Sequence, residues 1–68
     1  MSRRDEEKIE LAVTLEKQTE RAVLINDGDR KVWLAKSQVE PAEGEFPEDG
    51  EHFELLVPEW LAKKEGLL

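Results

Sequence analysis

Residues 21–35 read RAVLINDGDRKVWLA, two apolar runs on either side of Asp27-Gly28. The flanking runs are rich in β-branched and aromatic side chains, which favour strands. Asp-Gly between such runs is typical of a type I′ hairpin turn, which needs a positive φ at both central residues. We therefore expect an antiparallel hairpin here, with a positive φ at Gly28.

The register of this hairpin stays open. A two-residue loop would place Val23 opposite Val32 and Arg21 opposite Leu34. A three-residue loop with a bulge would pair Leu24 with Val32 and Val23 with Trp33. Both faces carry apolar side chains in either register, and such a sheet is either curled into a small barrel or covered by another element.

Further elements flank the hairpin. Residues 9–16 alternate apolar and more polar side chains, and this period of two predicts a strand. A helix over residues 5–20 is the competing interpretation, because Glu, Lys, Leu and Ala are good helix formers. Residues 52–57 predict a last strand. Residues 58–65 predict a short helix, with Pro58 in its first turn and Gly66 just past its end.

These elements predict a mainly β fold: a small curled antiparallel sheet, or an SH3-like or OB-like half barrel, with a short C-terminal helix. The alternative is an α+β fold with an N-terminal helix on a three-stranded sheet. We expect a flexible tail at residues 1–8 and one domain at 9–68. That domain contains an acidic loop at 40–51 and a helix at about 58–65.

The two tryptophans are expected in the core. The chain has 68 residues and only four aromatic side chains, and so small a domain has little apolar area to spare. We therefore predict that Trp33 and Trp60 are buried and that Trp60 docks the C-terminal helix. An exposed pair would instead be typical of an interaction surface.

The composition excludes several classes of protein. There is no cysteine, and the longest apolar runs have four residues, so neither a disulfide framework nor a membrane-spanning segment is expected. The net charge of −7 argues against direct binding to nucleic acid. We expect a cytoplasmic protein that acts as a monomer or a homodimer.

The sequence offers little for catalysis or for metal binding. His52 is the only histidine, and the possible nucleophiles near it are limited to serine and threonine. The run Asn26–Asp29 resembles part of a calcium loop but lacks the carboxylate expected at the twelfth position, so we interpret it as a turn. We therefore predict no enzyme activity, no metal and no cofactor.

Two motifs stand out, Trp33-Leu-x-Lys-Ser-Gln38 and Pro58-Glu-Trp-Leu61. They resemble short, mostly uncharacterised accessory proteins of bacteriophages and prophages, which implies a bacterial host. The resemblance spans about residues 11–39 and 53–68. One departure is Ala35, where the pattern often has proline. The resemblance implies a phage-type accessory protein and carries no catalytic residues to transfer.

The charge layout suggests where a partner would bind. Residues 1–39 hold eight acidic and eight basic side chains, whereas residues 40–54 hold seven acidic side chains and no basic one. We predict that this stretch binds a protein partner with a basic surface and so inhibits or modulates a host nucleic-acid-handling or defence complex. In the narrower form of this prediction, the carboxylates imitate the phosphates of nucleic acid. Phe46 is expected to act as an exposed apolar anchor. The alternative function is a structural or assembly module that works as a homo-oligomer through the tryptophans. The candidate partner-binding residues are Glu40, Glu43, Glu45, Phe46, Glu48, Asp49, Glu51 and Glu54.

Overall fold

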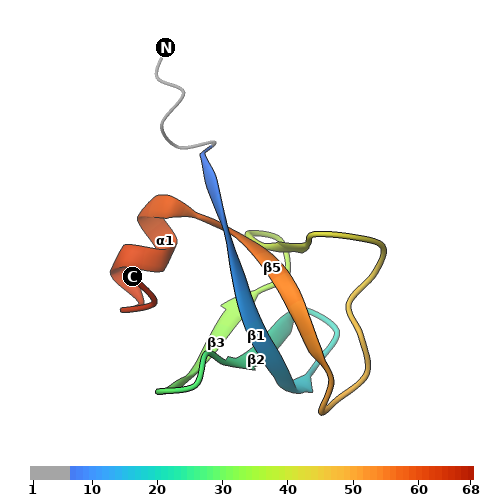
Figure 1. Ribbon diagram of the computed structural model, residues 1–68. Coiled ribbons are helices and arrows are strands. Elements are labelled where there is room, and N and C mark those ends of the chain that lie inside the picture. The colour runs from blue at the N-terminus through green and yellow to red at the C-terminus, as the bar shows by residue number, and fades with distance from the viewer. Residues whose placement is uncertain (1–6) are drawn as a thin grey trace.

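A five-stranded antiparallel sheet and one short helix make up the fold in the computed structural model, which describes residues 7–68 (Figure 1). The strands are β1 (Lys8–Gln18), β2 (Ala22–Asn26), β3 (Lys31–Ala35), β4 (Glu40–Pro41) and β5 (His52–Pro58), and the helix is α1 (Glu59–Lys64). Their order in the sheet is β3-β2-β1-β5-β4. The predicted mainly β fold with a C-terminal helix is confirmed. The alternative helix over residues 5–20 is wrong in its described part, residues 7–20, and residues 5 and 6 lie outside the described residues.

β1 is the central strand, and its alternation supplies one wall of the core. Val13 and Leu15 are buried, while Ile9 and Leu11 pack against the same cluster. The first part of β1 pairs with β5 and the last part with β2. The pairing with β2 shifts register between Leu15 and Lys17, and such a bulge bends and twists a strand. One long bent strand thus joins the two halves of the curled sheet.

The start of β1 shortens the predicted tail. β1 begins at Lys8, and the carbonyl of Glu7 accepts a hydrogen bond from the N–H of Glu59 at 3.0 Å. Residues 7 and 8 therefore belong to the fold. Residues 1–6 of the predicted tail lie outside the described residues.

The hairpin forms as expected, but with neither predicted register. Leu24 lies opposite Trp33 and Asn26 opposite Lys31, which leaves a four-residue connection at 27–30. Side-chain oxygens accept hydrogen bonds from the backbone of this loop. Oδ1 of Asn26 accepts from the N–H of Gly28 at 2.8 Å. Oδ1 of Asp27 accepts from the N–H groups of Asp29 and Arg30 at 2.8 and 3.0 Å. The bonds from the N–H groups of Asp29 and Arg30 lower the pKa of Asp27 below its ordinary value of 3.8.

Gly28 has the predicted positive φ, 106°. The type I′ turn is nevertheless wrong, because it requires a positive φ at Asp27 as well. Within residues 7–68 only glycines have a positive φ. The aspartate bonds to the backbone stabilise a longer loop instead, which is a common role of Asp and Asn in turns.

The predicted loop at 40–51 contains a short strand. β4 pairs with β5, with Glu40 opposite Leu56 and Pro41 opposite Leu55. Past β4 the chain leaves the sheet and projects on the side away from α1 (Figure 1). The sheet thus continues two residues further than the sequence suggested.

The C-terminal helix is shorter than predicted, by one residue at each end. Pro58 is the N-cap of α1 and Glu65 its C-cap. Gly66, with φ 79°, follows the helix, and the N–H of Leu67 bonds to the carbonyl of Ala62 at 2.8 Å. This pattern is a Schellman motif, as expected from the sequence.

The core is aliphatic, so the prediction that the tryptophans form it is wrong. Trp33 is 51% exposed and Trp60 is 42% exposed. Trp33 lies between two buried residues of β3 and so faces outward, while α1 docks through Leu61 and Ala62. The residues of the buried hydrophobic core are Val13, Leu15, Val23, Ile25, Val32, Leu34, Val39, Leu55, Val57, Leu61 and Ala62.

Candidate functional site

Two carboxylates from different strands meet on the outer face of the sheet. In the β1–β5 pair, Glu54 lies opposite Ala12, and Leu56 lies opposite Glu10. Glu10 and Glu54 are therefore diagonal neighbours on the same face of the sheet. A hydrogen bond with Glu54 and repulsion from its charge raise the pKa of Glu10 above its ordinary value of 4.5, and Glu43 adds to the repulsion. We call Glu10, Glu43, Glu45 and Glu54 the acidic surface.

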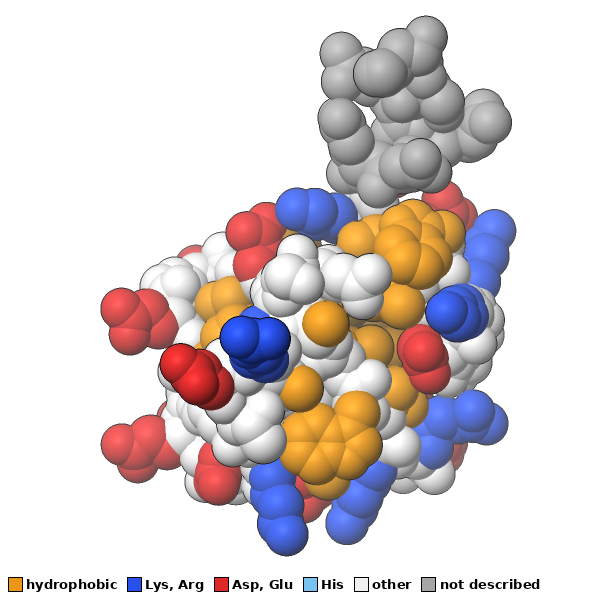
Figure 2. Space-filling model, turned by 180° about the vertical axis from the view of Figure 1, so that it is seen from behind, with side chains coloured by type: hydrophobic (Ala, Val, Ile, Leu, Met, Phe, Trp, Pro, Cys, Tyr) orange, Lys and Arg blue, Asp and Glu red, His pale blue; other side chains and the backbone are white. Residues whose placement is uncertain are grey.

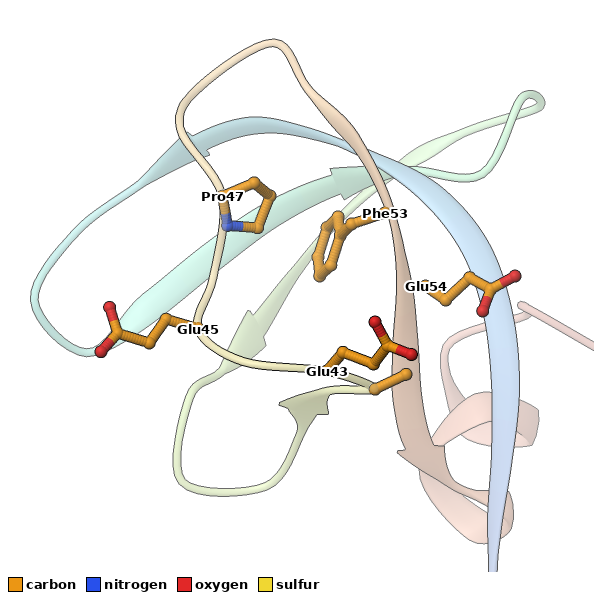
Figure 3. A pocket seen from close by; sticks show the side chains of 6 residues that line it. Glu43, Glu45, Pro47, Phe53 and Glu54 are labelled. Atoms are coloured by element: carbon orange, nitrogen blue, oxygen red, sulfur yellow. The ribbon is translucent and has the colours of Figure 1, made fainter.

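A hollow of about 260 Å³ opens beside this surface. Its walls come from the loop after β4 and from β5, and the lining residues are Ala42, Glu43, Glu45, Pro47, Phe53 and Glu54. Figure 3 shows Phe53 beside Pro47, with Glu45 and Glu54 on opposite sides of the ring. An aromatic ring with carboxylates around it is an environment that attracts an ammonium or guanidinium group.

Phe46 has a packing role that the sequence did not reveal. It is half-buried, packs against the core, and meets the ring of Phe53 edge to face with 6.1 Å between centroids. The Nζ of Lys36 lies 5.4 Å from the Phe46 ring centroid. The expectation that Phe46 is exposed is therefore wrong, and the residue holds the loop against the sheet.

Three other candidate residues occupy a turn at the opposite end of the loop. Glu48, Asp49 and Glu51 are all exposed. The backbone fixes this turn, because the N–H of Gly50 donates to the carbonyl of Leu15 at 2.6 Å and the N–H of Leu15 donates to the carbonyl of Glu51 at 2.9 Å. Their side chains are thus displayed on a fixed turn and take no part in the core.

Glu40 differs from the other candidates. Its carboxylate lies 3.0 Å from the Nζ of Lys8. Glu40 is on β4 and Lys8 on β1, so this ion pair spans Leu56 of β5 on the outer face of the sheet. Among residues 7–68, it is the only candidate carboxylate with an ion pair. The remaining acidic candidates therefore present charge without a compensating cation from the described part of the chain.

Sequence reasoning missed Glu10 and Phe53. Both positions follow from the pairing of β1 with β5, which sets Val13 opposite Phe53 and brings Glu10 near Glu54. The alternation of residues 9–16 already placed Glu10 on the outer face. The sequence alone does not show that β1 pairs with β5. It therefore could not place Glu10 and Phe53 beside the acidic loop.

His52 has one polar partner. Its Nδ1 lies 2.6 Å from Oγ1 of Thr14, which is its direct cross-strand neighbour. Over residues 7–68 no carboxylate hydrogen-bonds the ring to orient it as a base, and no group of side chains is suited to hold a metal ion. In the same range no helix is long and apolar enough to cross a membrane.

Comparison with protein-family models, curated proteins and solved structures finds no match to this chain. The resemblance to phage accessory proteins therefore stays a prediction.

Proposed function

We propose that this protein is not an enzyme and that it binds another protein through the acidic surface, with lysine or arginine side chains of the partner as its counterparts. The observation that carries the proposal is the hollow, where Glu43, Glu45 and Glu54 lie around the ring of Phe53. A side-chain hydrogen bond with Glu54 and the charge of Glu54 also raise the pKa of the neighbouring Glu10. Like charges held side by side cost the free protein stability, and a cation from a partner would remove that cost.

The hollow supplies a specific place for such a cation. An arginine or lysine side chain entering beside Phe53 would lie against an aromatic face and between the carboxylates of Glu43 and Glu54. The exposed carboxylates at residues 48–51 lie outside this contact and would act by long-range attraction, which mainly raises the association rate.

The finer form of the proposal names the kind of partner. Carboxylates spread over a loop and the neighbouring strands can occupy a groove that normally takes phosphates, so a nucleic-acid-handling or defence complex of a bacterial host fits the charge pattern. The setting would then be the host cytoplasm, and the protein would be a phage-type inhibitor or modulator. The net charge of −7 supports this form.

Affinity capture with matched variants tests the proposal. The neutralised variant carries Glu43→Gln, Glu45→Gln, Glu48→Gln and Asp49→Asn. The control carries the same chemical changes elsewhere: Glu7→Gln, Glu20→Gln, Asp29→Asn and Glu65→Gln. Wild type and control should capture the same basic protein from bacterial lysate, and the neutralised variant should lose it. Equal capture by all three proteins would contradict the proposal.

A further inference from the structure

The outer face of β2 and β3 carries an apolar patch that the core does not use. Leu24 lies opposite Trp33, and Ala22 lies opposite Ala35, on the side that faces away from the buried residues. Trp33 is 51% exposed, which is unusual for so large a side chain in a chain with only four aromatics. We call these four residues the tryptophan face.

Cations border this face. Lys31 is exposed on the same side of β3 as Trp33, and its Nζ lies 4.0 Å from Glu16, at the limit of an ion pair. Arg21 lines a hollow of about 490 Å³ together with Glu20, Ala35, Lys36 and Ser37, and the Nζ of Lys36 is directed to the Phe46 ring. Figure 2, which views the molecule from behind, shows large hydrophobic side chains on one face, with Lys and Arg side chains beside them and some Asp and Glu side chains nearby.

The charge of the border decides between possible occupants. A second copy docking by the same face would bring its own Lys31 and Arg21 toward those of the first copy, and like charges would oppose the contact. Nucleic acid would meet these cations favourably but would also be repelled by the net charge of −7. An acidic protein segment with apolar side chains complements both the cations and the indole.

We propose that the tryptophan face docks an acidic, apolar segment of a partner protein, with an apolar side chain against Trp33 and carboxylates near Lys31 and Arg21. The acidic surface lies on other strands and would attract the opposite charge, so this inference is independent of the function proposed above. With both surfaces, one molecule would bridge a basic protein and an acidic one.

Fluorescence titration of the full chain tests the docking site. Trp60→Phe leaves Trp33 as the only tryptophan, so its emission reports on this face. The probe is a synthetic peptide that alternates glutamate and leucine, and the comparison peptide has lysine in place of glutamate. We expect saturable binding and a blue shift with the acidic peptide only, because Trp33 leaves water when it is covered.

Variants then locate the contact. Trp33→Ala, followed by a dye-labelled peptide, should weaken binding about tenfold or more, as removal of a central aromatic anchor does. Arg21→Gln with Lys31→Gln should also weaken it, whereas Lys63→Gln with Lys64→Gln, a matched loss of two cations on α1, should not. The neutralised variant of the capture experiment should bind the acidic peptide at least as well as wild type does. Thermal melts confirm that each variant is folded.

Several results would overturn the inference. These are no binding of the acidic peptide, equal binding of the lysine peptide, preferential binding of a single-stranded oligonucleotide, or a dimer in sedimentation that Trp33→Ala dissociates. The last would restore the homo-oligomer suggested by the sequence. None of these outcomes bears on the acidic surface, which the capture experiment tests separately.

Discussion

At the level of single residues, Glu10 is a side chain on the outer face that does not stabilise the fold. Glu10 lies on the outer face of β1, and its contact with Glu54 raises its pKa. A raised pKa in an acid means that the folded protein binds the proton more tightly than the unfolded chain does. The penalty from this carboxylate is therefore present above the raised pKa and disappears as the pH falls below 4.5.

Glu10→Gln should then be at least as stable as wild type at pH 7, and its advantage should shrink toward pH 4. Thermal melts across this pH range measure the difference, with Glu20→Gln as a control for loss of an exposed carboxylate. A wild type that melts above Glu10→Gln at pH 7 would show that the contact with Glu54 stabilises the fold.

The tryptophan and the leucine of α1 make a second contrast. Leu61 is 3% exposed and Trp60 is 42% exposed. Leu61→Ala should cost about 2–5 kcal/mol, the usual range for truncating a buried leucine. Trp60→Ala should cost less, about 1–2 kcal/mol, because much of its ring is already in water. Denaturant unfolding compares the two variants, and a larger loss for Trp60→Ala would mean that the indole anchors the helix.

Among the elements, the hairpin loop at 27–30 depends on one glycine. Gly28 has a φ of 106°, and a Cβ there would meet no atom within 4 Å. Gly28→Ala should therefore be destabilising through backbone strain alone, by about 1–3 kcal/mol. Asp29→Ala in the same loop is the control. Equal unfolding free energies for Gly28→Ala and wild type would place the loop in another conformation.

The elements were predictable where one signal dominated. The period of two in residues 9–16 indicated β1, and the order Pro58, Lys64, Gly66 indicated α1 and its C-cap. The hairpin register was not predictable, because both faces of β2 and β3 carry apolar residues and the side chains of Asn26 and Asp27 cap a longer loop. The same ambiguity hid the outward orientation of Trp33.

The candidate site was predictable only in part. The acidic loop is visible as charge in the sequence, but the hollow beside it combines Pro47 of the loop with Phe53 of β5. The packing of Phe46 was not predictable, because its contacts, Phe53 and Lys36, lie outside the acidic loop. The charge of a segment can be read from the sequence alone, whereas contacts between strands require the structure.

For the molecule as a whole, uneven charge is the main property. The carboxylates at 43–49 are exposed and, within residues 7–68, form no ion pair. The neutralised variant should therefore unfold at the same temperature as wild type or a higher one, because mutual repulsion is reduced. A clear drop in its thermal midpoint relative to the matched control would mean that these carboxylates stabilise the fold.

The association rate with the captured basic partner, measured against salt concentration, tests the acidic surface most directly. Wild type and the matched control should associate fast at low salt and more slowly as salt screens the charges. The neutralised variant should associate about tenfold more slowly at low salt and show a flatter salt dependence. An unchanged association rate and salt dependence in that variant would contradict the account and leave the carboxylates as a solvated loop.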